Sequence, residues 1–384
     1  MASDHIQSTS FPPSAVSTKP KDAEVMALEK ESLSSTPPAT HNEHGHGEHG
    51  VFHHPREYRP TTVDGVTAYA EHGPLVDHKI PQEDVVQSMP DLAWSRFRHY
   101  MREPFAEFMG VFILIMFGDG VVAQVVLSNA TKGDYQSISW GWGLGVMLGV
   151  YTSGISGAHL NPAVTFANCV FRKFPWRKFP VYMVAQVLGA MCASGVVYAN
   201  YKSAIDVFEG GPNIRTVPGY SDTATAGIFC TYPAAFMTKT GQFFSEFIAS
   251  TLLMFLIYVL KDDGNLGAGP LTPLGLFFVI FGIGACFGWE TGYAINLARD
   301  FGPRLMSYML GYGRNVWRAG DYYFWVPMVA PFFGCTFGGW LYDMFLFTGE
   351  SPINTPVVGL MRFLQPNRKT WSNTYVPPQK ISQA

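Results

Sequence analysis

The chain has 384 residues, and its 26 Lys and Arg against 29 Asp and Glu leave a formal net charge of -3. This balance gives no sign of a nucleic-acid partner, and the five cysteines follow no spacing typical of a disulfide framework or a zinc knuckle. The length alone would suit two or three soluble domains, but the apolar residues are clustered rather than spread. Several windows between Pro104 and Phe347 are long and apolar enough to cross a bilayer. Soluble domains are therefore excluded for the middle of the chain.

The N-terminal segment, residues 1 to about 90, is rich in Ser, Thr, Pro, His, Lys and Glu and poor in large apolar residues. Such a composition predicts disorder, because too little surface can be buried to offset the ordering entropy. A dense histidine cluster within it has two interpretations, a weak metal or pH-sensing site and a solvated low-complexity tail, and we favour the tail. The cluster comprises His41, His44, His46, His49, His53 and His54.

Residues 91–102 carry Trp94, Phe97 and Met101 at helical spacing among arginines. This pattern predicts a juxtamembrane amphipathic helix whose arginines face anionic lipid headgroups. Residues 1–103 together are expected to form a cytoplasmic N-terminal region.

Six membrane-spanning helices are predicted from the apolar runs, and two shorter apolar stretches follow polar turns. The spans are residues 105–127, 138–152, 179–200, 243–260, 271–288 and 323–347, with a long loop over 201–239 and a polar tail from 348 to 384. Basic residues near the span ends fall on one side of the membrane if there are six spans. We therefore expect a multi-pass protein of the plasma membrane with both termini in the cytoplasm.

The two halves of the channel region, about 104–200 and 243–347, repeat each other. Glu107-Phe108 in the first span corresponds to Glu246-Phe247 in the fourth, each about fifty residues before a polar turn. Because each half holds three spans, the second half must be inserted upside down relative to the first. Inverted repeats with broken segments meeting near the bilayer midplane are typical of transport proteins.

The polar turns are residues 156–165, reading Ser-Gly-Ala-His-Leu-Asn-Pro-Ala-Val-Thr, and residues 291–300, reading Thr-Gly-Tyr-Ala-Ile-Asn-Leu-Ala-Arg-Asp. A half-helix entering from each face would bring two helix N-termini, with unpaired N–H groups and positive dipole ends, to the centre. Asn161 and Asn296 would cap these ends and direct their amides into the lumen. Non-helical backbone at this depth is tolerable only beside a watery lumen.

At these residues the chain resembles the major intrinsic protein family, the aquaporins, and more closely the glycerol-conducting aquaglyceroporins of fungi. The resemblance covers about Pro104 to Phe347. It implies an all-α membrane fold of six transmembrane helices and two re-entrant half-helices in an inverted repeat. It also implies a homotetramer with one pore in each protomer.

The resemblance assigns roles to particular residues. The pore turns fall on Asn161, Pro162, Ala163, Asn296, Leu297 and Ala298, and the outer constriction falls on Trp142, Gly284, Tyr293 and Arg299. Arg299 is expected to donate to a passing hydroxyl and repel cations, while Trp142 and Tyr293 form an apolar corner. Gly284 replaces the bulky histidine of water-selective relatives, which implies a wider opening. Asp300 is shared with the glycerol branch, and Leu297 departs from the usual proline.

Several of these residues have alternative interpretations. Trp142 and Tyr293 also suit interfacial or packing aromatics, whereas an arginine at membrane depth is costly unless it faces water or a partner. Glu107 and Glu246 could carry protons, but we favour carboxylates that hold buried loop N–H groups. His159 could gate by protonation, although in the family it more often braces the loop.

We therefore predict a channel for passive, bidirectional flow of glycerol and other small neutral solutes, with water as a co-permeant and no cofactor, metal or chemistry. The rivals are a water-selective or other small-solute channel of the same fold, and a non-conducting membrane protein whose tail binds partners or metal. Enzymes are disfavoured because the core has one histidine and no nucleophile–base pairing. The sequence leaves open the physiological solute, the effect of Leu297 and any role of the tail in gating.

Overall fold

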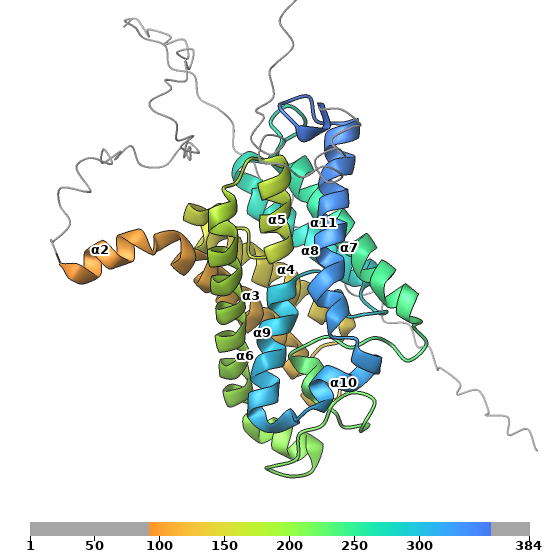
Figure 1. The fold of residues 1–384 in the computed structure, drawn as a ribbon. Helices are drawn as coiled ribbons and strands as arrows, with labels where there is room; N and C mark the ends of the chain where they lie inside the picture. The colour runs from red at the N-terminus through yellow and green to blue at the C-terminus, as the bar shows by residue number, and fades with distance from the viewer. Residues whose placement is uncertain (1–91, 355–384) are drawn as a thin grey trace, which may run out of the picture. The chain divides into compact units, whose positions relative to one another are not determined.

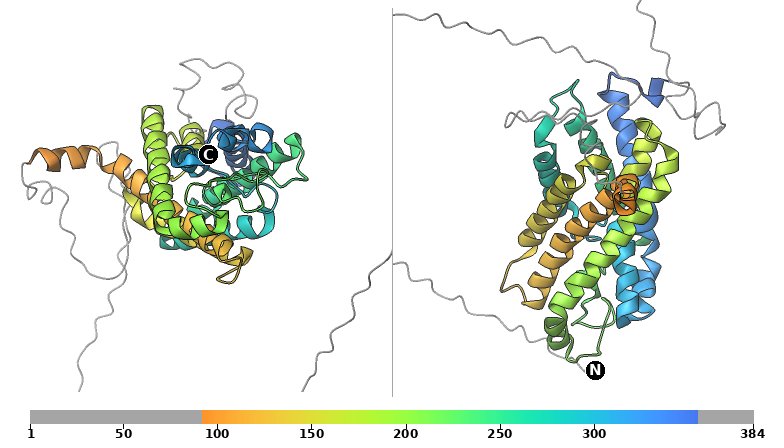
Figure 2. Two further views of the ribbon diagram at one scale, coloured as in Figure 1. Left: turned by 90° about the horizontal axis from the view of Figure 1, so that it is seen from below. Right: turned by 90° about the vertical axis from the view of Figure 1, so that its left-hand side faces the viewer.

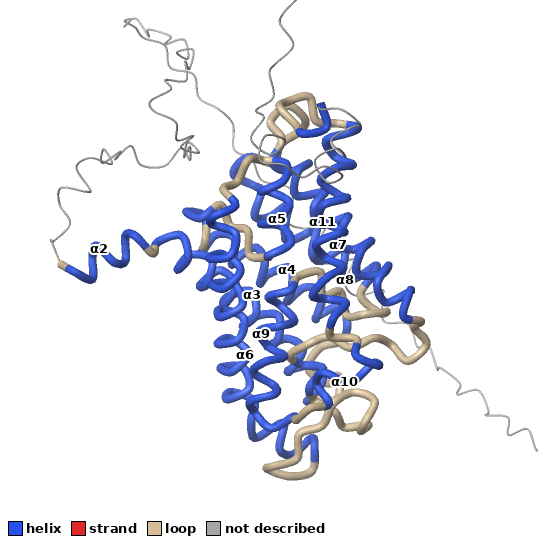
Figure 3. The backbone as a smooth tube through the Cα atoms, viewed as in Figure 1, coloured by secondary structure: helices blue, strands red, loops and turns tan. Residues whose placement is uncertain are grey.

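The computed structural model describes residues 92–354, and within this range it contains helices and loops but no strand (Figure 3). The long apolar runs become helices because lipid offers no partner for an unpaired backbone group. The long helices are α3 (Arg102–Leu127), α4 (Tyr135–Thr152), α6 (Phe179–Glu209), α7 (Lys239–Lys261), α8 (Thr272–Phe287) and α11 (Trp325–Phe345). The shorter ones are α2 (Ala93–Tyr100), α5 (Pro162–Phe171), α9 (Leu297–Ser307) and α10 (Asn315–Tyr322). Single-turn segments are η1 (Gly154–Ser156), η2 (Trp176–Lys178), η3 (Ala226–Ile228), η4 (Gly269–Leu271), the π-turn η5 (Tyr308–Tyr312) and η6 (Pro352–Asn354).

Within the described range, 4 helices are long and apolar enough to cross a membrane, or up to 5 if the bent pair α10 and α11 is one span. These four are α3, α7, α6 together with the preceding turn η2, and α8 together with the preceding turn η4. The helices α10 and α11 are bent by 62° to each other. The remaining long helix, α4, is richer in glycine and polar residues, and it packs between α3 and α8. The six predicted spans thus correspond to six long helices of the bundle (Figure 1).

The two halves pack in the same way. In the first half α3 packs on α4 and α6, and in the second half α7 packs on α8 and α11 (Figure 2). A Cβ added at Gly189 of α6 would lie 2.3 Å from the Phe108 carbonyl oxygen, and one added at Gly334 of α11 would lie 2.5 Å from that of Phe247. Glycine lets both helix pairs approach at equivalent points, as small residues do in membrane bundles.

The two short helices α5 and α9 lie one above the other in the middle of the bundle (Figure 1). Each packs across the repeat: α5 contacts α11, and α9 contacts α6. Each starts within its polar turn, directly after the asparagine, with Asn161 and Asn296 as the N-cap residues. The N-termini of the two half-helices therefore meet near the centre of the molecule.

The helix of the third predicted span is longer than the sequence indicated. We predicted its end near Asn200, but α6 continues to Glu209, so residues 201–209 of the predicted loop are helical. The extension is stabilised by protein rather than lipid, because Ile205 is fully buried in an apolar cluster with Val217 and Phe229 of the following loop. The histidine cluster and the C-terminal tail from residue 355 lie outside the described residues.

Candidate functional site

The two polar turns share one backbone conformation. Ala158 and Leu160 have φ of 52° and 54°, and the equivalent Tyr293 and Ile295 have φ of 37° and 42°. Positive φ is uncommon for residues with a side chain and persists only where surrounding structure enforces it. The matching strain indicates that both turns are held in the same way.

A buried glutamate holds each turn. Glu107 of α3 accepts hydrogen bonds from the His159 and Leu160 amides (2.9 and 2.8 Å), and Glu246 of α7 accepts from the Ala294 and Ile295 amides (2.9 and 2.7 Å). Both glutamates are 0% exposed. Bonds from backbone amides to a carboxylate are strong, and an unpaired buried amide would be costly. Each carboxylate therefore stabilises the strained backbone that precedes a half-helix.

The capping asparagines connect the two turns to each other. The Asn161 side-chain oxygen accepts from the Ala163 amide, and its Nδ2 donates to the Ile295 carbonyl (2.8 Å). The Asn296 oxygen likewise accepts from Ala298 and Arg299, and its Nδ2 donates to the Leu160 carbonyl (2.8 Å). An amide nitrogen has two protons, so each Nδ2 retains a second N–H beyond the one used across the repeat.

His159 lies against the first turn. Its Nδ1 is 3.2 Å from the Thr165 hydroxyl, and its ring packs on Phe174 and Tyr182. The imidazole is part of the lining of the central cavity. Its contacts are those of a packed side chain on the turn.

Three of the four predicted constriction residues, Trp142, Tyr293 and Arg299, line the same cavity and lie close to one another. The Arg299 guanidinium carbon lies 4.0 Å from the centre of the Trp142 ring, and the rings of Trp142 and Tyr293 stand edge to face at 6.4 Å. Arg299 Nη1 also donates to the Phe229 carbonyl (3.2 Å). A cation held over an aromatic face is stabilised by the ring quadrupole, so the arginine has a fixed orientation.

The fourth residue, Gly284 of α8, acts through its neighbour. A Cβ added there would lie 2.8 Å from both Cζ and Oη of Tyr293. The Tyr293 ring thus occupies part of the space that a larger residue at position 284 would fill. The replacement of histidine by glycine therefore frees only part of the volume that the sequence predicted. Tyr135 donates to the Gly284 carbonyl (3.0 Å), and the buried Tyr293 hydroxyl has no hydrogen-bond partner among the described residues.

Asp300 lies behind the constriction rather than in it. Its carboxylate accepts from the Thr231 amide and hydroxyl (2.8 and 2.6 Å) and pairs with Arg304 through Nε (2.7 Å). Arg304 also donates to the Thr231 carbonyl (2.7 Å). This fully buried pair fastens the long extramembrane loop to α9.

One cavity joins these features. Trp142, Tyr293 and Arg299 line it together with Asn161, Asn296 and His159, and the rest of its wall is apolar. The apolar lining consists mainly of Leu114, Val146, Val150, Val164, Leu253, Ile257, Leu276 and Ile280. Gly284, Glu107, Glu246 and Asp300 stand behind the wall. An apolar cavity with a few hydrogen-bonding groups in its wall suits small solutes with both hydroxyl and carbon surfaces.

Sequence reasoning missed some residues of the site. Gly118 of α3 seats the constriction tryptophan, because an added Cβ would lie 2.3 Å from the Trp142 ring. The Phe229 carbonyl and Tyr135 are contacts across distant parts of the chain, and no local pattern marks them.

Comparison with known proteins identifies the class. Residues 94–342 match the family model described as major intrinsic protein. The chain is 80% identical over 301 residues to Aquaglyceroporin-9 of Botryotinia fuckeliana. The aligned region covers 78% of this chain and 66% of that protein. It is 74% identical over 283 residues to Probable aquaglyceroporin-2 of Gibberella zeae, covering 74% of this chain and 84% of the relative. The X-ray structure of the aquaglyceroporin from Plasmodium falciparum is similar at 33% identity with a TM-score of 0.57, covering 64% of this chain and 97% of that one.

The chain belongs to the major intrinsic protein family. The predicted all-α membrane fold is confirmed, and the protein is a transport protein of the membrane rather than an enzyme. This chain spans about two thirds of the length of the Botryotinia relative.

Proposed function

We propose that the protein is a channel for passive, bidirectional flow of glycerol and other small neutral solutes, with water as a co-permeant. The observation that carries this proposal is the single cavity that joins Trp142, Tyr293 and Arg299 to Asn161 and Asn296. Similarity to relatives named aquaglyceroporins supports the choice of solute. No chemistry and no cofactor are required.

The constriction suits a polyol. The Arg299 side chain presents N–H donors on one side, while the Trp142 and Tyr293 rings present apolar surface on the other. A glycerol molecule can place its hydroxyls toward the arginine and its carbon chain toward the rings. Because each group of the solute then meets a matching surface, desolvation in the narrow segment is offset by direct contacts.

Cations would be excluded at two places. The N-termini of α5 and α9 both face the asparagine pair, so their dipoles oppose a cation at the centre. Arg299 adds a full positive charge at the constriction. Cations therefore meet repulsion along the path, while the remaining asparagine N–H groups can donate to a neutral hydroxyl.

The supporting residues act on the shape of the path. We assign Glu107, Glu246 and His159 to bracing the turns, since their contacts are to the turns themselves. Asp300 braces the outer loop. These contacts favour a bracing role over the proton-carrier and gating interpretations.

Topology and regions are part of the proposal. Residues 1–103 would be cytoplasmic with an amphipathic helix at their end, 104–347 would form the channel in the plasma membrane, and 348–384 would be a cytoplasmic tail. Support comes from Arg172, Lys178 and Lys261, which lie at the predicted cytoplasmic ends of their segments. Protease treatment of intact cells tests this orientation. An epitope at the N-terminus should survive the treatment, and loss of the epitope would show that the N-terminus lies outside the cell.

The protein is also proposed to form a homotetramer with one pore per protomer. The cavity is lined by α3, α4, α5, α7, α8, α9 and their turns from a single chain, so a pore is complete without a partner. The mass of the purified detergent complex, corrected for detergent, should equal four chains. A monomeric mass would contradict this assignment.

A swelling assay separates the proposal from its rivals. Vesicles that hold the purified protein are exposed to a glycerol gradient and, separately, to an impermeant osmolyte that reports water flow. Glycerol-driven swelling above that of empty vesicles is expected. Water flow without glycerol flow would favour a water-selective channel, and neither flow would favour a non-conducting protein.

A further inference from the structure

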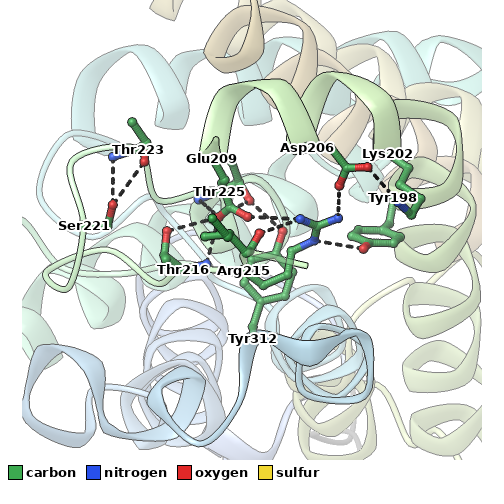
Figure 4. Close-up of polar contacts among 11 residues, drawn as sticks. Tyr198, Lys202, Asp206, Glu209, Arg215, Thr216, Ser221, Thr223, Thr225 and Tyr312 are labelled. Atoms are coloured by element: carbon green, nitrogen blue, oxygen red, sulfur yellow. Dashed lines mark hydrogen bonds and ion pairs between the residues drawn. The ribbon is translucent and has the colours of Figure 1, made fainter. Parts of the chain in front are cut away.

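A polar cluster fastens the long outer loop to the end of α6 (Figure 4). At its centre the Glu209 carboxylate, 6% exposed as a residue, lies between two parts of that loop. Its Oε1 accepts from the amide and hydroxyl of Thr216 (2.8 and 3.1 Å) and from the amide and hydroxyl of Thr225 (3.2 and 2.9 Å). The Ala226 amide also donates to the Thr216 carbonyl (3.2 Å), so the loop is closed on itself beside Glu209.

Arg215 completes the cluster. Its guanidinium donates to Asp206 Oδ1 (2.5 Å), to the Tyr198 hydroxyl (2.9 Å) and to Glu209 Oε2 (3.4 Å), and its side chain is 3% exposed. Burial disfavours the charged guanidinium, but the hydrogen bonds with Asp206 and Tyr198 outweigh burial and raise the pKa of Arg215. The arginine is therefore a permanently charged partner for both acidic side chains.

Two tyrosines lead from this cluster to Phe229. The Tyr312 hydroxyl lies 2.7 Å from the Thr225 hydroxyl, and the Tyr198 hydroxyl is held by Arg215. The rings of both tyrosines pack on the Phe229 ring, at centroid distances of 6.2 and 6.1 Å. Because Phe229 is 0% exposed, its position is set by these rings and by the short turn Ala226–Ile228 that follows Thr225.

The backbone of Phe229 in turn contacts a residue of the proposed constriction. Its carbonyl accepts the Arg299 Nη1 bond (3.2 Å), and Arg299 is the charged residue of the constriction. A displacement of Phe229 would release the guanidinium from this acceptor while leaving its contact with the Trp142 ring. The cluster at the end of α6 is thus connected to the constriction by an unbroken series of contacts.

We propose that Glu209 and Arg215 are positioning residues for solute selectivity, because they hold the Phe229 carbonyl in place to fix Arg299 across the constriction. The inference rests on the proposed glycerol channel. A cluster that merely stabilised the loop would lower all flows together, in proportion to the amount of folded protein. A positioning role changes the ratio between solutes.

The test compares polyol ratios in two variants. Glu209→Gln keeps the shape and one carbonyl oxygen for the threonine donors, but it loses the charge that pairs with Arg215. Tyr312→Phe removes only the hydroxyl that meets Thr225 and keeps the ring on Phe229, so it serves if the first variant fails to fold. Ser221→Ala is the matched control, because among the described residues Ser221 bonds only to Thr223 within the same loop.

Swelling rates of vesicles are measured with glycerol and with a four-carbon polyol for each purified protein. Both variants should raise the ratio of four-carbon polyol flow to glycerol flow by about threefold, since weakening one hydrogen bond changes an equilibrium by a factor of this order. The control should keep the wild-type ratio. Unchanged ratios in both variants, with a conducting wild type, would overturn the positioning role alone. A wild type without glycerol flow would remove the proposed function and this inference with it.

Discussion

Gly284 and Tyr293 share one space at the proposed constriction, and we propose that this pair sets the size of the solute that passes. A side chain at position 284 would meet the Tyr293 ring at 2.8 Å, so the tyrosine can stand there only beside a glycine. The sequence predicted the importance of Gly284 through a comparison with histidine in relatives. It did not predict that the tyrosine fills part of the vacated volume, because residues 284 and 293 belong to different elements.

Gly284→His should suppress glycerol flow more than water flow. The imidazole would push Tyr293 toward the lumen and narrow a passage that water, being smaller, can still use. Stopped-flow swelling of vesicles with both osmolytes measures the two rates. Gly282→Ala is the control on the same helix, since a Cβ there has nothing within 4 Å. An equal fall of both flows in Gly284→His would place the constriction elsewhere.

Gly118→Ala should disturb Trp142 in a related way. The added methyl group would lie 2.3 Å from the indole ring, so the ring must move toward Arg299 and the lumen. We expect reduced glycerol flow and a loss of roughly 1–3 kcal/mol of stability from overpacking. Flow assays and thermal unfolding in detergent measure both effects. Gly120→Ala, two residues along the same helix in open space, should behave as wild type; similar losses in both variants would contradict a specific contact with Trp142.

At the scale of elements, the sequence predicts the two half-helices well, but it predicts less well the contacts that hold the turns before them. The two Asn turns and the short apolar stretches after them predict where α5 and α9 begin, and both begin directly after their asparagines. The repeated Glu-Phe pairs pointed to the glutamates that accept the turn amides. The matched positive φ at Leu160 and Ile295 could not be predicted, because it depends on carboxylates about fifty residues away.

Loop contacts were the least predictable part of the fold. Residues 201–209 have the mixed composition of a loop but remain helical, because Ile205 packs against loop residues rather than lipid. The contact between Phe229 and Arg299 uses a backbone carbonyl, which every residue type has, so the identity of residue 229 does not predict it. Backbone groups and long-range packing leave little trace in a single sequence.

Leu297 is the departure from the usual proline at the start of α9. Asn296 caps the helix through the Ala298 and Arg299 amides, and Leu297 already occupies the first helical position. A proline there loses no helical hydrogen bond and restricts the unfolded chain. Leu297→Pro should therefore keep glycerol flow and raise stability by about 0.4–1 kcal/mol, measured by thermal unfolding. A loss of flow with intact folding would show that the leucine shapes the pore.

At the scale of the molecule, the described residues that line the cavity all lie between Leu114 and Arg299. A chain that lacks residues 1–90 should insert into membranes, fold and conduct glycerol at the wild-type rate per protein. Quantitative immunoblots of membrane fractions and vesicle swelling test the two parts. Loss of insertion would contradict the assignment of the region as a disordered tail, and altered flow with normal insertion would give the tail a regulatory role.

The central claim is that the cavity between Arg299 and His159 is the conducting path. The most direct measurement is glycerol-driven swelling of vesicles that hold wild type, Ile280→Trp or Phe278→Trp. Ile280 lines the cavity and is 6% exposed, whereas Phe278 on the same helix is 57% exposed and faces outward. Wild type and Phe278→Trp should swell faster than empty vesicles, and Ile280→Trp should return to the empty rate while eluting at the wild-type size. Glycerol flow through Ile280→Trp at the wild-type rate, or none through the wild type, would contradict the account.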